Sequence, residues 1–192
     1  MQVAFVSSEI APFAKVGGLA DVSAALPRAL AQRGHDIRVF APLYRRTRDA
    51  GHVFETVAGL DSLTATFGPH RVPFSVKTSV LPGTDLKAYF IDCPPLYDRE
   101  GIYTNDPDEH LRYLTLCYAS MAACQHMGFS PDIVHANDWQ TALLPLILNV
   151  RMGWDRQRFA RTKTVFTIHN LAHQGAFGAG THRDTGLEDA PF

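Results

Sequence analysis

The amino-acid sequence predicts a doubly wound α/β domain, built on a mostly parallel sheet with an inserted β-rich segment. Short, uninterrupted apolar runs recur along the chain, as at residues 3–6 and 37–41, and such runs are typical of strands that are covered on both faces. Residues with helical apolar periodicity lie between several of these runs, which favours β-α-β units. Polar clusters follow three of the runs, at the strand ends where open parallel sheets bind ligands.

The first β-α-β unit opens the chain. A strand is expected at residues 3–7, and a helix from about residue 20 to residue 33, with a buried stripe of Leu19, Val22, Leu26 and Leu30. Pro27 is expected to kink or restart this helix, because proline lacks the amide hydrogen that a helix interior needs. Gly34 ends the helix, and residues 37–41 form a second strand, parallel to the first through a right-handed crossover.

The middle of the chain predicts strands without intervening helices. Four β-rich pieces, separated by turn-forming Gly and Pro residues, cover residues 53–57, 63–67, 72–80 and 86–91. We expect them to form an antiparallel or mixed extension of the parallel core. Residues 95–107 are expected to form an irregular loop, in which Tyr97 and Tyr103 are either handles for a ligand or surface residues packed on the domain.

Helix and strand patterns alternate again after this loop. The expected elements are a helix capped by Asp106 or Asp108 and ending near residue 127, a strand at residues 132–136, a helix starting near residue 140 and a strand at residues 164–168. No element is predicted for residues 178–192.

Composition describes an ordinary globular chain that forms one domain over residues 1–192. Hydrophobic residues make up 46%, charged residues 19%, and the formal net charge is −1. Such a balance gives no sign of disorder and lacks the basic excess that nucleic-acid binding needs. No signal peptide is visible, and the apolar residues 143–150 are too few to cross a bilayer. We therefore expect a soluble, cytoplasmic protein without a nucleic-acid or membrane partner.

The three cysteines predict neither a disulfide framework nor a zinc site. Cys93, Cys117 and Cys124 are odd in number and include no C-x-x-C pair, which suits a reducing compartment. Cys117 and Cys124 are expected to be small core residues of one helix.

The turn at residues 15–21, Lys-Val-Gly-Gly-Leu-Ala-Asp, predicts a cradle for a phosphate or pyrophosphate. Gly17 and Gly18 allow a tight turn that brings bare N–H groups close to a ligand. The following helix points its positive end at the same spot, and Lys15 adds a cation. An ordinary glycine turn with a solvated lysine is the competing interpretation.

Three polar clusters are expected to converge on one edge of the sheet, together with this turn. They are residues 7–9, 135–138 and 169–170, each at the carboxyl end of an expected strand. The pair His169 and Asn170 favours a functional site, since burying both polar groups demands partners.

Several of the polar residues also have a structural explanation. His135 is equally consistent with a hydrogen-bonded core histidine, and Asp138 stands where a helix N-cap is wanted. His173 could be a plain loop residue.

Three motifs follow one another in a fixed order: residues 15–21, residues 135–139 (His-Ala-Asn-Asp-Trp) and residues 169–175 (His-Asn-Leu-Ala-His-Gln-Gly). Together they closely resemble bacterial glycogen synthase and plant starch synthase. Residues 3–12 and the loop at 97–103 are similar too, so the resemblance covers nearly the whole chain.

This resemblance implies one half of a GT-B-type glycosyltransferase, in which two Rossmann-like domains enclose the active site. The family transfers glucose from ADP-glucose to the non-reducing end of an α-1,4-glucan such as glycogen, retains the anomeric configuration and needs no metal or other cofactor. The chain would then be the amino-terminal catalytic domain, without its carboxy-terminal partner domain. We expect the isolated chain to lack activity.

Donor-side roles follow from the first motif. By resemblance, Lys15, Gly17 and Gly18 contact the nucleotide diphosphate of ADP-glucose, and Asp21 lies close to the donor.

The other two motifs imply catalytic and acceptor-side residues. By resemblance, the carbonyl of His169 faces the positive charge that develops on the transferred glucose, and Asp138 lines the acceptor side. These two are the catalytic candidates, and Tyr103 and Asn170 are the acceptor-side candidates.

Three positions depart from the family pattern: Val16 replaces a usual threonine, Asn137 a common histidine and His173 a common tyrosine. The choice between an ADP and a UDP donor therefore stays open.

Two other functions compete with glucosyl transfer. A dinucleotide-dependent oxidoreductase lacks support, because the first turn is not G-x-G-x-x-G and Ala41-Pro42 replace an acidic residue after the second strand. The alternative that a single domain leaves open is a nucleotide- or glucan-binding module without catalysis.

Overall fold

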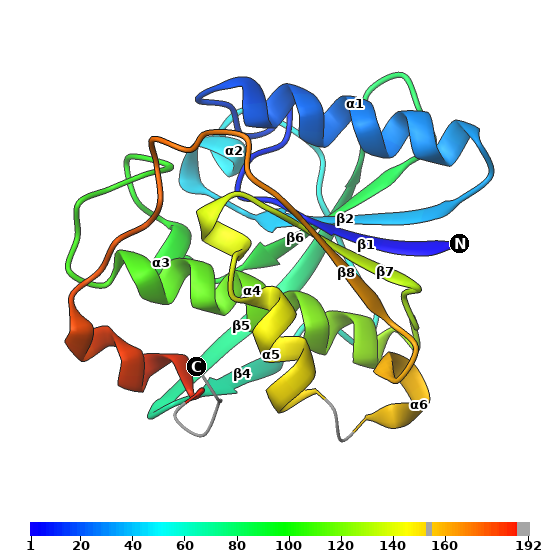
Figure 1. Cartoon of the computed structure of the whole chain (residues 1–192). Helices are drawn as coiled ribbons and strands as arrows, with labels where there is room; N and C mark the ends of the chain where they lie inside the picture. The colour runs from blue at the N-terminus through cyan, green and yellow to red at the C-terminus, as the bar shows by residue number, and fades with distance from the viewer. Residues whose placement is uncertain (153–154, 188–192) are drawn as a thin grey trace.

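The computed structural model describes residues 1–152 and 155–187, and shows one sheet with helices on both faces (Figure 1). The strands are β1 (Gln2–Val6), β2 (Asp36–Pro42), β3 (Glu55–Thr56), β4 (Leu63–Phe67), β5 (His70–Val80), β6 (Lys87–Asp92), β7 (Ile133–Asn137) and β8 (Lys163–Thr167). The α-helices are α1 (Gly18–Gln32), α2 (Arg45–Asp49), α3 (Pro94–Tyr97), α4 (Glu109–His126), α5 (Leu144–Arg151) and α6 (Arg156–Phe159). Two 3₁₀ helices are η1 (Trp139–Thr141) and η2 (Ala179–Thr185).

The sheet has a parallel core and an antiparallel extension. Its order is β3-β5-β6-β2-β1-β7-β8, and β4 pairs with β5. The strands from β6 to β8 along this order are parallel to one another, whereas β5 runs antiparallel to β6, β3 and β4. The predicted doubly wound, mostly parallel sheet with a mixed β-rich insertion is confirmed.

Alternate residues of the central strand β1 enter two separate cores. Val3 and Phe5 pack on the side of α1, whereas Ala4 and Val6 pack with residues of α4 and α5. Successive strand side chains point to opposite faces, so a strand between two helical layers needs an uninterrupted apolar run. Figure 1 shows α1 above the sheet and α4 with α5 below it.

Two of the predicted helices differ from the sequence expectation. Helix α1 continues through Pro27 without restarting, and Pro27 is itself one of its buried residues, so packing on the sheet outweighs the lost amide. The single helix expected from residue 140 is divided into η1 and α5, because Pro145 lies in the first turn of α5, where proline is favoured.

Details of the loops and the tail differ as well. Asp108 occupies the N-cap position of α4, but its side chain makes no cap bond and instead binds Arg99 at 2.6 Å. Tyr97 is fully buried rather than a surface handle. Helix η2 lies in the tail for which no element was predicted, and residues 188–192 of that tail lie outside the described part.

Cys117 and Cys124 are buried free cysteines of α4, as expected. Among the described residues, none of the helices has the length and apolar character needed to span a membrane.

Candidate functional site

The carboxyl ends of β1, β7 and β8 meet at one edge of the sheet. The amide Nδ2 of Asn137, the last residue of β7, donates to the carbonyl of Val6 at the end of β1 over 3.1 Å. The backbone N–H of Asp138 donates to the carbonyl of Thr167 at the end of β8 over 2.9 Å. The polar residues that follow these three strands are therefore neighbours, although more than a hundred residues separate those after β1 from those after β7 and β8.

Asp138 connects the loop after β7 to the loop after β8. Its carboxylate Oδ1 accepts the backbone N–H of His169 at 2.6 Å and of Asn170 at 3.3 Å. The residue is 7% exposed and has φ 58° and ψ 179°. Its side chain makes no cap bond to η1, so the explanation of Asp138 as a helix N-cap is wrong. The carboxylate instead accepts the amides of the loop after β8.

Two histidines lie beneath this connection. Nε2 of the half-buried His169 lies 3.0 Å from Oδ1 of Asn137, and Nε2 of His135 lies 2.8 Å from Oγ1 of Thr167. Burial, and secondarily the nearby His169, lowers the pKa of His135 and favours its neutral form. His135 also packs edge-on against Phe5 with ring centroids 4.9 Å apart, which matches a hydrogen-bonded core histidine.

The loop after His169 is more exposed. Asn170 and His173 are exposed, and the side chain of Asn170 accepts the backbone N–H of Ala172 at 3.0 Å. Asn170 thus closes its own turn, and His173 has the surroundings of a loop residue.

The turn at residues 15–18 differs from the predicted cradle in one respect. The N–H groups of Val16 and Gly17 donate to Oε2 of Glu9 at 2.7 and 3.0 Å. These two amides therefore serve the buried carboxylate of Glu9. Glu9 belongs to the polar cluster predicted after the first strand, but no role could be predicted for it, because its position in the sequence does not show which amides it meets.

Lys15 and the start of α1 remain open to solvent. The ammonium of Lys15 pairs with Asp21 at 2.6 Å, and their side chains are 50% and 58% exposed. In the part of the chain that the structure describes, the N-cap residue of α1, Gly17, has no side-chain cap bond. The positive end of a 15-residue helix and a mobile cation thus share this part of the edge.

The two glycines are not required by the conformation of this turn. Gly17 is extended, with φ −137° and ψ −160°, and Gly18 begins the helix. A Cβ built at either position would have no heavy atom of the described residues within 4 Å. The turn therefore keeps empty space in front of it, as a backbone that approaches a ligand closely would need.

Tyr103 reaches the same corner from the loop between α3 and α4. Its hydroxyl donates to Oε1 of Glu9 at 2.5 Å and lies 3.1 Å from Oγ of Ser8. Burial is the main cause that raises the pKa of Tyr103, so its hydroxyl keeps its proton.

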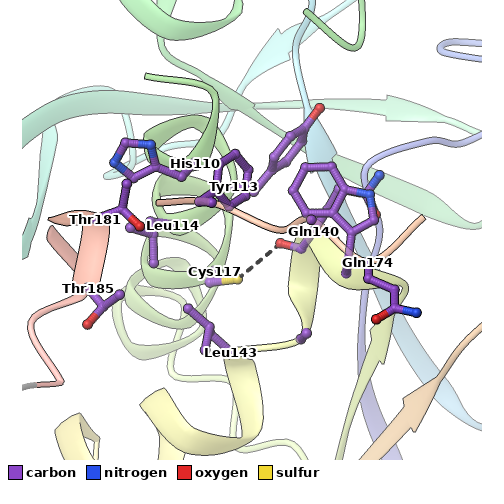
Figure 2. Close-up of a pocket in the computed structure, with 13 residues that line it drawn as sticks. His110, Tyr113, Leu114, Cys117, Gln140, Leu143, Gln174, Thr181 and Thr185 are labelled. Atoms are coloured by element: carbon purple, nitrogen blue, oxygen red, sulfur yellow. Dashed lines mark hydrogen bonds between the residues drawn. The ribbon is translucent and has the colours of Figure 1, made fainter. Parts of the chain in front are cut away.

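A cavity of about 250 Å³ opens beside Trp139, the residue after Asp138. Figure 2 shows Tyr113, His110 and Gln140 among the side chains around it. Aromatic side chains of Tyr113, Trp139 and Phe177 line it together with polar groups such as His110 and Gln140. The Oε1 atom of Gln140 and Nδ1 of His110 are buried without a hydrogen-bond partner among the described residues.

Gly175 fixes the loop against the indole of Trp139. Its φ is +60°, and a Cβ there would lie 2.2 Å from Cε3 of Trp139. Here the glycine is demanded by both backbone conformation and space. In the described residues, no group of three His, Cys, Asp or Glu side chains has a geometry that could hold a metal ion.

Comparison with known proteins identifies the family of the chain. The family described as starch synthase catalytic domain matches residues 2–192. The chain belongs to this family. The catalytic domain of starch synthase IV from Arabidopsis thaliana, solved with ADP and acarbose, has a TM-score of 0.83 and 27% identity, over 97% of this chain and 37% of that one. This likeness confirms the GT-B-type α/β fold of the starch synthase family for the chain.

Curated relatives of the family are longer proteins. The chain is 39% identical to the glycogen synthase of Geotalea daltonii over 199 residues, covering 100% of this chain and 40% of the relative. It is 40% identical to that of Thermotoga maritima, over 98% of this chain and 39% of the relative. With the glycogen synthase of Myxococcus xanthus the identity is 42%, over 97% and 39% respectively. The chain thus spans about two fifths of the length of these relatives.

Proposed function

We propose that this chain is the amino-terminal half of a glycogen synthase, a glucosyltransferase that uses ADP-glucose to extend the non-reducing end of an α-1,4-glucan with retention of configuration. The observation that carries the proposal is the meeting of the Lys15 turn, Asp138 and His169 at one edge of a parallel sheet. Open α/β sheets bind their ligands at this edge. A second α/β half, which the greater length of the relatives supports, would close the cleft over it.

The donor side is the turn after β1. Departure of ADP leaves negative charge on its terminal phosphate, and stabilising developing charge is a large part of catalysis. Lys15 would leave Asp21 for this phosphate, assisted by the positive end of α1 and by the close approach that Gly17 and Gly18 permit. ADP in the Arabidopsis relative supports a nucleotide of this kind here.

The reacting sugar and the acceptor would lie over Asp138 and His169. The bond from the N–H of His169 to Asp138 orients the peptide, so that its carbonyl can face the positive charge on the transferred glucose. Because Oδ1 of Asp138 takes both amides, Oδ2 is the oxygen for an acceptor hydroxyl. Tyr103 and Asn170 border this side.

The cavity beside Trp139 extends the acceptor side. A sugar ring presents apolar faces and polar edges, which suit the aromatic walls of this cavity and the polar residues His110, Gln140 and Gln174 that also line it. Acarbose in the Arabidopsis relative supports a glucan-like ligand.

The experiment measures transfer of labelled glucose from ADP-glucose, and in parallel from UDP-glucose, to maltooligosaccharide. A polypeptide that joins this chain to a second α/β half should transfer glucose, and its His169→Ala variant should be at least 100-fold slower, a typical loss for a transition-state contact. The matched control is His126→Ala, because His126 is exposed at the end of α4, which leads into the amino end of β7 and so lies at the opposite edge of the sheet from the site.

The isolated chain should bind ADP but give no turnover. Robust transfer by the isolated chain would refute the need for a second half. ADP or glucan binding without transfer by the joined polypeptide would instead support the alternative, a binding module without catalysis.

A further inference from the structure

Glu9 joins the donor turn to the acceptor-side loop through one buried carboxylate. The residue follows β1 and is 3% exposed. Its Oε2 accepts the N–H groups of Val16 and Gly17 at 2.7 and 3.0 Å, and its Oε1 accepts the hydroxyl of Tyr103 at 2.5 Å. The proposed donor and acceptor elements therefore share a single side chain.

The charge of Glu9 makes these contacts interdependent. A buried carboxylate is tolerated only when hydrogen-bond donors or cations compensate it, and here the compensation comes from two amides and one hydroxyl. Hydrogen bonds to an ionised group are roughly twice as strong as neutral ones. When one donor leaves, the remaining donors must satisfy the whole charge, so the turn and the loop respond to each other.

Glu9 also decides how the turn faces its ligand. Because the N–H groups of Val16 and Gly17 point at Glu9, the outward surface of the turn is formed by Lys15, the glycine backbone and the start of α1. A change in the Tyr103–Glu9 contact would reorient those amides, and with them the surface offered to a phosphate.

We propose that Glu9 is a positioning residue that couples the two substrate sites, so that glucan on the Tyr103 side and nucleotide on the Lys15 side alter each other's affinity. The inference rests on the proposed function. By linkage, the factor by which a glucan changes nucleotide affinity equals the factor by which the nucleotide changes glucan affinity.

The test measures ADP dissociation constants by calorimetry, with and without saturating maltotriose, on the polypeptide with both halves. Glu9→Gln keeps the shape of the side chain and removes the charge, and Tyr103→Phe removes only the hydroxyl. Tyr97→Phe is the matched control, because Tyr97 is a buried tyrosine of the preceding segment whose hydroxyl donates to the carbonyl of Arg112 at 2.8 Å and does not meet Glu9.

We expect Glu9→Gln to weaken ADP binding about tenfold and Tyr103→Phe about threefold, as charged hydrogen bonds are lost. The double variant should resemble Glu9→Gln alone, because residues that act through one contact are not additive. Either single variant should abolish the effect of maltotriose on ADP affinity, and Tyr97→Phe should preserve both the affinity and the effect.

Different results would overturn different claims. If Tyr103→Phe binds ADP as tightly as Tyr97→Phe does, Glu9 does not couple the sites, and this comparison holds even if Glu9→Gln fails to fold. The same conclusion follows if the losses of ADP affinity in Glu9→Gln and Tyr103→Phe simply add in the double variant. If the unsubstituted polypeptide does not bind ADP at all, the proposed function itself is refuted.

Discussion

Asp138 combines a rare backbone conformation with two hydrogen bonds, and substitutions can separate the two. Its φ of 58° and ψ of 179° lie at the edge of a region that glycine populates almost alone. Holding a residue with a side chain there costs about 1–3 kcal/mol. The hydrogen bonds from the amides of His169 and Asn170 to the carboxylate offset this cost, because they stabilise the folded conformation of Asp138.

The structure predicts an order of stability for three variants. Asp138→Ala loses both hydrogen bonds and keeps the strain, so we expect a loss of about 2–4 kcal/mol, from about 1.5–3 for the 2.6 Å bond and less for the 3.3 Å bond. Asp138→Gly loses the same bonds but relieves the strain, and after the entropic cost of glycine it should be about 1–2 kcal/mol more stable than the alanine variant. Asp138→Asn keeps an acceptor oxygen and should stay within about 1 kcal/mol of the unsubstituted protein.

Urea unfolding midpoints and thermal melts measure this order. For a chain of this size, the glycine variant should melt about 2–8 °C above the alanine variant. All three variants should lose glucosyl transfer in the polypeptide with both halves, because none keeps the carboxylate for the acceptor.

Two results would refute this reasoning. A glycine variant no more stable than the alanine variant would show that the backbone of Asp138 is unstrained. Near-normal transfer by Asp138→Asn would show that the charge of Asp138 is not used.

Three other perturbations are predicted. Lys15→Met should change the free energy of unfolding by about 0.5 kcal/mol or less, since the ion pair of Lys15 with Asp21 is exposed. Calorimetry should nevertheless show about tenfold weaker ADP binding, because a phosphate loses a charged hydrogen-bond donor. Unchanged ADP affinity would contradict a place for Lys15 in the site. Gly175→Ala should lower the free energy of unfolding by about 1–3 kcal/mol, through backbone strain and overlap with Trp139. It should also raise the KM for maltooligosaccharide. An unchanged urea midpoint together with an unchanged KM would contradict the contact. The pKa of His135 is lowered in the folded chain, so as the pH drops the unfolded chain takes up the proton of this histidine first. The free energy of unfolding should therefore fall below about pH 6.5. His135→Gln should flatten that part of the pH profile of the urea midpoint, and an unchanged slope would contradict the lowered pKa.

The sequence was sufficient for the main fold because the relevant signals are local. The apolar run at residues 3–6 indicates a strand that is covered on both faces, and the apolar stripe of α1 indicates a helix that is covered on one face. The two patterns can be told apart because side chains repeat at different intervals in strands and helices. The polar residues after β1, β7 and β8 marked the site, because parallel strands deliver their carboxyl ends to the same edge.

Local rules failed where distant contacts decide. Helix η2 lacks an apolar stripe, but Asp184 binds His70 at 2.7 Å and His110 at 2.8 Å, which attaches η2 to β5 and α4. Helix α1 keeps Pro27 because its buried face packs on the sheet. Neither contact can be inferred from neighbouring residues.

By itself, the sequence determined the strands of the sheet, the long helices α1 and α4, the two-sided burial of the sheet and the polar groups that follow its strands. Only the tertiary structure decided how those groups are paired: Tyr103 meets Glu9 across 94 residues, and Asp138 meets the amide of His169 across 31. The physical reason is the separation along the chain over which each feature is decided. Side-chain periodicity records the environment of each residue, whereas the choice of hydrogen-bond partner depends on which loops the folded sheet brings within about 3 Å of each other.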